Sequence, residues 1–167
     1  MSDTLYAGLS AATLATLDGL RNVEWFANVG RPDTDRADFV ATWDEAIKNC
    51  GSLEWENLCL EAANQYRERV AELSPSRLSH WNETVAMVKP ASQALVREKI
   101  ADVIAREDLP KIFVDTVDWD ILHLCMEAEF GDIHPAGFYA SQAYWYAAGH
   151  FPCGWRGAFP DGQLIIF

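Results

Sequence analysis

The stretch WYAAGHFPCGW, residues 145–155, holds the side chains of this chain that are best suited to chemistry. His150 and Cys153 lie three residues apart, and H-x-x-C spacing can place both side chains on one metal ion. The same spacing could let the imidazole of His150 act as the base for a Cys153 nucleophile. No recognised local signature of a thiol enzyme surrounds the pair.

A structural zinc site needs four ligands, so His150 and Cys153 would need two more. His123 and His134 are the candidates, and each is isolated in the sequence. The alternative is purely structural. A helix ends at Gly149, His150 lies near the negative end of its dipole, and aromatic rings close the core around the turn.

Negative charge gathers between residues 107 and 132, where there are eight acidic residues and one basic residue. An acidic surface of this kind could bind a basic partner by electrostatic complementarity. The candidate partner-binding residues are Asp115, Asp118, Asp120, Glu127, Glu129 and Asp132.

The same residues allow two other interpretations. Glu127, Glu129, Asp132 and His134 offer the ligands of a divalent-metal site. Alternatively, the aspartates sit favourably at a helix N-terminus and the glutamates form its solvated face. His123 and Glu127 are spaced i, i+4 on the predicted helix, which suits metal binding, acid–base work or an ordinary side-chain contact.

Composition limits the class of protein. The chain has 167 residues, 50% hydrophobic and 23% charged, which predicts one globular domain over residues 1–167. Net charge −12 disfavours binding to nucleic acid or to an anionic membrane surface, and it favours a basic protein partner. The chain has no GxGxxG, GxxxxGK[ST], GxSxG or HExxH motif, so we predict no catalytic residue and no cofactor.

The four cysteines contain no CxxC pair and indicate reduced thiols. The opening MSDTLYAGLS carries an acid and no Lys or Arg before its apolar residues, unlike a secretory signal, and no apolar run is long enough to cross a bilayer. These features predict a cytoplasmic location.

Apolar residues recur at helical spacing through most of the chain, so the predicted fold is mainly α: a single-domain bundle of six or seven helices over about residues 3–148. The first helix is expected to reach about residue 28, and the second to include Phe39 and Val40. Ser74 and Pro75 predict a helix start, and Pro90 predicts a break or a kink before a helix over about 91–106. Helices over about 116–130 and 136–148 follow. A β-hairpin closes the domain over about 151–167.

The C-terminal stretch WYAAGHFPCGWRGAFPDGQLIIF resembles the ends of small bacterial cytoplasmic proteins of the accessory or immunity type. The resemblance covers about the last 23 residues and implies an interaction protein with an acidic character. It implies no catalytic residue.

We therefore predict a non-enzymatic, immunity-like or accessory protein that binds a basic protein. The alternative is a small metal-dependent or thiol enzyme that uses His123, His134, His150 and Cys153. A binder of apolar small molecules, with a cavity lined by some of the seven Trp, is a third possibility.

Overall fold

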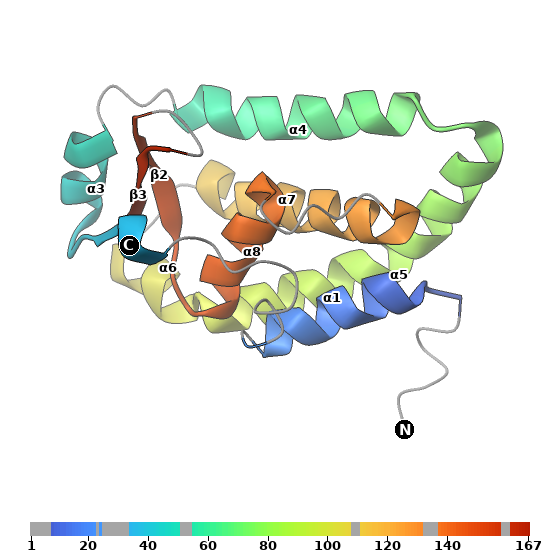
Figure 1. Cartoon of the computed structure of the whole chain (residues 1–167), viewed down its shortest axis with the longest axis horizontal. Helices are drawn as coiled ribbons and strands as arrows, with labels where there is room; N and C mark the ends of the chain where they lie inside the picture. The colour runs from blue at the N-terminus through green and yellow to red at the C-terminus, as the bar shows by residue number, and fades with distance from the viewer. Residues whose placement is uncertain are drawn as a thin grey trace.

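The computed structural model describes residues 8–22, 24, 34–50, 55–107, 111–131, 137–157 and 161–167. Within these ranges the fold is mainly helical, with seven α-helices and one small sheet, so the predicted fold class is confirmed (Figure 1). The helices are α1 (Ala11–Arg21), α3 (Trp43–Cys50), α4 (Trp55–Ala71), α5 (Pro75–Lys99), α6 (Ala101–Glu107), α7 (Lys111–Phe130) and α8 (Phe138–Ala147). A 3-10 turn, η2 (Thr34–Arg36), precedes the first strand.

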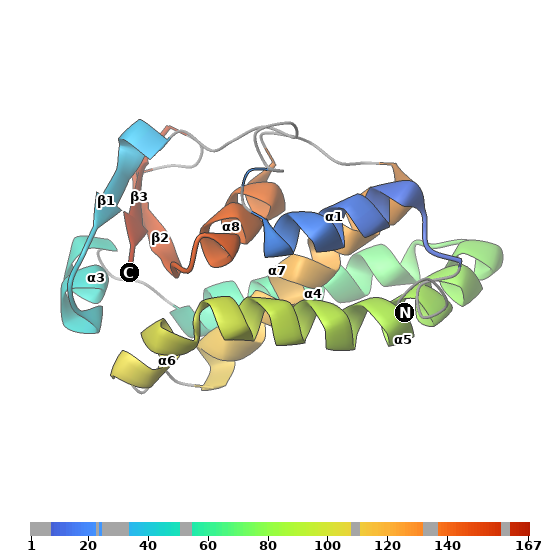
Figure 2. The same cartoon turned by 90° about the horizontal axis from the view of Figure 1, so that it is seen from below.

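Helix α7 is the centre of the helical body. It packs against α1, α4, α5 and α8 (Figures 1 and 2). Its residues from Asp120 to Ala128 are all buried. A helix that is apolar nearly all round must lie inside the bundle, as the sequence predicts for this segment.

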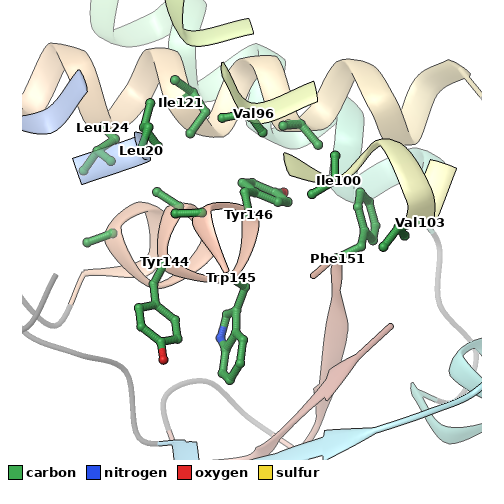
Figure 3. Close-up of a cluster of buried hydrophobic side chains, with 14 of the residues drawn as sticks. Leu20, Val96, Ile100, Val103, Ile121, Leu124, Tyr144, Trp145, Tyr146 and Phe151 are labelled. Carbon is green, nitrogen blue, oxygen red and sulfur yellow. The ribbon is translucent and has the colours of Figure 1, made fainter. Parts of the chain in front are cut away.

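The core continues from α7 into α5, α8 and the turn after α8. Figure 3 shows Tyr146 on the side of α8 that faces Val96, and Phe151 beside Ile100 and Val103, with Tyr144 and Trp145 on the opposite side of α8. All of α8 from Ala140 to Ala147 is buried. This part of α8 is therefore covered by other elements on all sides, and its packing sets where the chain enters the sheet at β2.

The sheet has three strands in the order β1-β3-β2 and lies at one end of the helical body (Figure 2). Strand β2 (Pro152–Arg156) and strand β3 (Gln163–Ile166) form the predicted C-terminal hairpin. Strand β1 (Ala37–Phe39) pairs in parallel with β3, with Phe39 opposite Ile166. Helix α3 packs on β2 and β3.

Local sequence signals explain several helix ends. Ser74 caps α5, its Oγ accepts from the backbone N–H of Arg77, and Pro75 takes the first helical position. After α8 the chain turns at Gly149, whose φ of +85° lies in the left-handed region that glycine adopts without strain. Both signals were predicted from the sequence, and the structure confirms them.

Two helix predictions are wrong. Helix α1 ends at Arg21, with Asn22 in an extended conformation, so the first helix does not continue past Arg21 as expected. Its predicted start near residue 3 and its predicted end near residue 28 lie outside the described residues. Pro90 does not end a helix, because α5 runs through it to Lys99. The carbonyl that loses its partner belongs to Ala86, an exposed residue, where water can replace the missing N–H.

The segment 37–39 is also a correction, because Phe39 and Val40 were expected to be helical. Phe39 is in β1, and the N–H of Val40 donates to the carbonyl oxygen of Ile166 at 2.9 Å. The helical spacing is real only from Trp43 onward, where α3 begins. Pairing with a strand more than 120 residues away overrides the local pattern.

Candidate functional site

The polar residues of α7 form the most distinctive cluster in the described structure. Asp120 is 1% exposed, and its Oδ2 accepts a hydrogen bond of 2.8 Å from the hydroxyl of Tyr146 on α8. Burial raises the pKa of Asp120 to about 7, although the bond from Tyr146 lowers it. Asp120 is thus a carboxyl group that changes charge near neutral pH inside the core.

His123 lies one turn further along α7 and is completely buried. Its Nε2 lies 3.0 Å from the carbonyl oxygen of Ala62 on α4, and only an N–H can pair with a carbonyl, so Nε2 carries the proton. Its ring stacks on Tyr139 of α8, with centroids 4.0 Å apart and planes 6° from parallel. Burial lowers the pKa of His123 to about 4, so the ring is neutral at physiological pH.

Glu127 and Glu129 follow on the same helix and bind different neighbours. Glu127 is buried and pairs with Arg69 of α4 at 3.3 Å. The side chain of Glu129 is 3% exposed and lies 2.6 Å from Nε2 of His80 on α5. Glu129 also accepts hydrogen bonds from the side chain of Thr13 and the backbone of Ser10 at the start of α1. Burial alone would raise the pKa of Glu129, but these hydrogen bonds lower it.

Asp118 is held on the α5 side of α7. Its Oδ2 accepts from Gln93 at 2.6 Å and from Arg97 at 2.8 Å. Burial still raises the pKa of Asp118 above its usual value. Asp115 is half-buried, and Asp132 lies outside the described residues.

The acidic block is therefore not one solvated surface. Asp120, Glu127 and Glu129 point into the bundle, and Asp118 is largely covered and paired with Arg97. These carboxylates join α7 to α1, α4, α5 and α8. These acids connect α7 to the neighbouring helices. The side chains of Asp120, Glu127 and Glu129 are buried, so a docking partner cannot reach them in this fold.

The metal interpretation finds no support in the part of the chain that the structure describes. That part holds no group of three or more His, Cys, Asp or Glu placed to bind one metal ion. The i, i+4 pair does not act as a unit, since His123 binds Ala62 while Glu127 binds Arg69. His134 lies outside the described residues.

Cys153 is in a setting that disfavours nucleophilic chemistry. It is completely buried in β2, and its Sγ lies 3.4 Å from the carbonyl oxygen of Phe151, to which the thiol donates. Burial raises its pKa well above the usual range, which disfavours the reactive thiolate. The ring of His150 instead packs edge-on against Phe39 and Trp145, at centroid distances of 5.1 and 6.2 Å.

Sequence reasoning missed the residues that complete the α7 cluster. Tyr139 and Tyr146 on α8 lie seven residues apart, and Ala62 and Arg69 on α4 are spaced the same way. Each pair marks one face of a helix over two turns. The spacing is visible in the sequence, but it does not say which helices will be neighbours.

A second feature lies on the surface, at the sheet end. Phe39 on β1 is 56% exposed, the most exposed large hydrophobic side chain among the described residues. Exposed acids lie before and after β1 in the chain, at Asp35, Asp44 and Glu45, and Lys48 follows them. Nearby bases are paired, because Arg36 contacts Asp161 at 3.5 Å and Arg156 contacts Asp38 at 3.2 Å.

Searches against models of protein families, curated proteins and solved structures gave no match to this chain. The C-terminal resemblance to immunity-type proteins therefore stays a prediction. Among the helices that the structure describes, none is both long and apolar enough to span a membrane.

Proposed function

We propose that this protein acts by binding a basic protein, as an accessory or immunity-like protein without catalytic activity. The observation that carries the proposal is the net charge of −12 on a chain of 167 residues. Net charge acts over distances longer than a contact, so it steers a basic partner towards the molecule even where single acids are paired.

The exposed charges of the described residues bear on where such a partner can dock. Among the residues whose exposure is described, twelve acids and nine bases are exposed, and most acids of α7 are internal. The acids are Asp18, Glu24, Asp35, Asp44, Glu45, Glu61, Glu68, Glu72, Glu83, Glu98, Asp102 and Asp161, and the bases are Arg21, Arg36, Lys48, Arg67, Arg77, Lys89, Arg97, Lys99 and Arg156.

The test is capture of a partner from the native host with the whole chain as bait. We expect a basic protein that co-elutes with the bait at fixed stoichiometry in size-exclusion chromatography and dissociates as salt is raised. A bait with Glu68, Glu72, Glu83 and Glu98 changed to Gln keeps the internal pairs of α7 and reduces the net charge. It should associate more slowly and with a weaker salt dependence.

Two outcomes count against the proposal. One is the absence of any stoichiometric partner from the host in which the protein is expressed. The other is a partner that is itself acidic and that binds equally well at low and high salt. Reversing the charge of Asp118, Asp120, Glu127 and Glu129 is not a useful test, because those side chains support the fold.

A further inference from the structure

The two outer strands of the sheet differ in how well their edges are protected. Strand β2 has Pro152, which cannot donate a ladder hydrogen bond, and an irregular register between Pro152 and Gly154. Both features block the addition of another strand. Strand β1 has no proline and no lysine, and its one charged residue, Asp38, pairs with Arg156 across the sheet.

Strand β1 lies at an edge of the sheet and is only three residues long. Here β3 lies on one side of β1, and within the described part of the chain no strand pairs with the other side. One further strand would turn β1 into an interior strand.

Side chains around β1 indicate what such a strand would carry. The ring of Phe39 is exposed on one side and packs against Trp145 on the other, with 5.8 Å between the ring centroids. Phe39 therefore offers a partner an apolar surface whose position is fixed by Trp145. Asp44 and Glu45 follow the strand and are exposed, and Lys48 is the exposed base that comes after them. A partner residue next to Phe39 should be apolar, and residues beside the acids should be basic.

We infer that the outer edge of β1 binds an extended segment of the partner protein, with alternating apolar and basic residues, as a fourth strand of the sheet. The inference rests on the proposed function, since it names the place and the mode of that binding. Main-chain hydrogen bonds would supply affinity, while Phe39 and the flanking acids would supply specificity.

The test uses the whole chain and a ten-residue peptide of alternating Val and Lys as the probe. Binding is measured by fluorescence anisotropy, and its position by the amide NMR signals of residues 37–39. We expect saturable binding that shifts these signals. We also expect at least a tenfold loss of affinity for the same peptide with alternate amides N-methylated, and for a Val–Glu peptide.

Matched variants locate the site. Phe39→Ser should weaken binding at least fivefold, whereas Leu60→Ser on α4, where Leu60 is 52% exposed, should change it less than twofold. Asp44→Lys with Glu45→Lys should weaken it at least tenfold. Glu83→Lys with Glu98→Lys changes the net charge equally and should have a much smaller effect.

Three results overturn the inference: no binding of the Val–Lys peptide, equal binding of the N-methylated peptide, or equal effects of each variant and its control. The captured partner separates this inference from the proposed function. If Phe39→Ser still captures the partner at full yield, the surface is wrong and the function stands. If no partner is captured by the unaltered chain, the proposed function itself fails.

Discussion

Tyr146 donates a hydrogen bond to Asp120 across the α7–α8 interface, and both side chains are buried. One neutral donor is a poor substitute for water around a carboxylate, so the ionised form of Asp120 is disfavoured in the folded state. The unfolded chain has no such constraint. The charge on Asp120 therefore links the stability of the interface to pH.

Asp120→Asn should stabilise the protein at alkaline pH. The pKa of Asp120 is raised to about 7 in the folded state, against about 3.9 when unfolded, so its favourable contribution is full below pH 4 and lost as the pH rises through 7. At pH 8 the variant should gain on the order of 1–4 kcal/mol, whereas at pH 5 the gain should be small. Urea unfolding at both pH values measures this difference in the free energy of unfolding between the variant and the unaltered protein. A difference that is constant between pH 5 and pH 8 would contradict the assignment, and exposed Asp102→Asn is the control.

Glu129→Gln should destabilise the protein, and the loss should be largest at neutral pH, the reverse of the pH dependence expected for Asp120. The pKa of Glu129 is lowered on folding, so the ionised carboxylate stabilises the fold above about pH 4.3, and this contribution is lost as the pH falls through the folded value. The side chain of His80 is 44% exposed, so the loss is that of hydrogen bonds to a charged group, about 1.5–3 kcal/mol. Thermal unfolding at pH 7 and at pH 3.5 should show a large deficit at the first and a small one at the second. Glu83→Gln, on the exposed face of α5, should show neither.

His123 should stay neutral far below the usual pKa of histidine. Its pKa is lowered to about 4, and the bond to Ala62 places the proton on Nε2. Ring ¹⁵N chemical shifts should therefore report the Nε2–H tautomer from pH 8 down to about pH 5. A ring that becomes charged near pH 6.5 would show that His123 is not held in the core as described.

Cys125 and Cys153 should resist modification in the folded protein. Both are completely buried, and burial raises the pKa of Cys125 to about 12 and that of Cys153 further still. Because the thiolate is the reactive species, labelling by a maleimide should be at least 100-fold slower than in urea. Peptide mass spectrometry gives the rate for each site. Rapid labelling of Cys153 at pH 7 would restore the thiol-enzyme interpretation.

Deleting residues 162–167 should unfold the whole domain. Leu164, Ile165, Ile166 and Phe167 are almost fully buried, and each buried side chain of this kind contributes about 1.5–3 kcal/mol. The sum approaches or exceeds the stability of an ordinary domain. Circular dichroism of the truncated chain tests this. If that chain cannot be purified, Ile165→Ala should cost about 2–5 kcal/mol, against little for exposed Leu60→Ala. An unchanged melting temperature would mean that the tail is an appendage.

Signals that act within one turn of chain were readable from the sequence. The Ser74–Pro75 start of α5, the glycine turn after α8 and the hairpin strands depend on residues that are neighbours in sequence. Strand β1 was not readable, because it forms only through pairing with residues 164–166. The effect of Pro90 could not be predicted from the local sequence either. Val88 and Val96, on either side of it, are both buried, and α5 continues through the proline.

The acidic residues of α7 were singled out from the sequence as a docking surface, but charge alone does not tell which face of α7 will be buried. Asp120, Glu127 and Glu129 are internal because Tyr146, Arg69 and His80, from three other helices, meet them. Only the three-dimensional arrangement supplies these partners.

The position of β3 in the middle of the sheet has a consequence for synthesis on the ribosome. Residues 163–166 leave the exit tunnel after the helices α1 to α8, yet β1 and β2 pair only through them. Until then β1 has no ladder, and Phe151 lacks its two backbone hydrogen bonds with Phe167. The sheet can therefore form only after the helices α1 to α8 have been synthesised, which makes pairing with β3 a late step of folding.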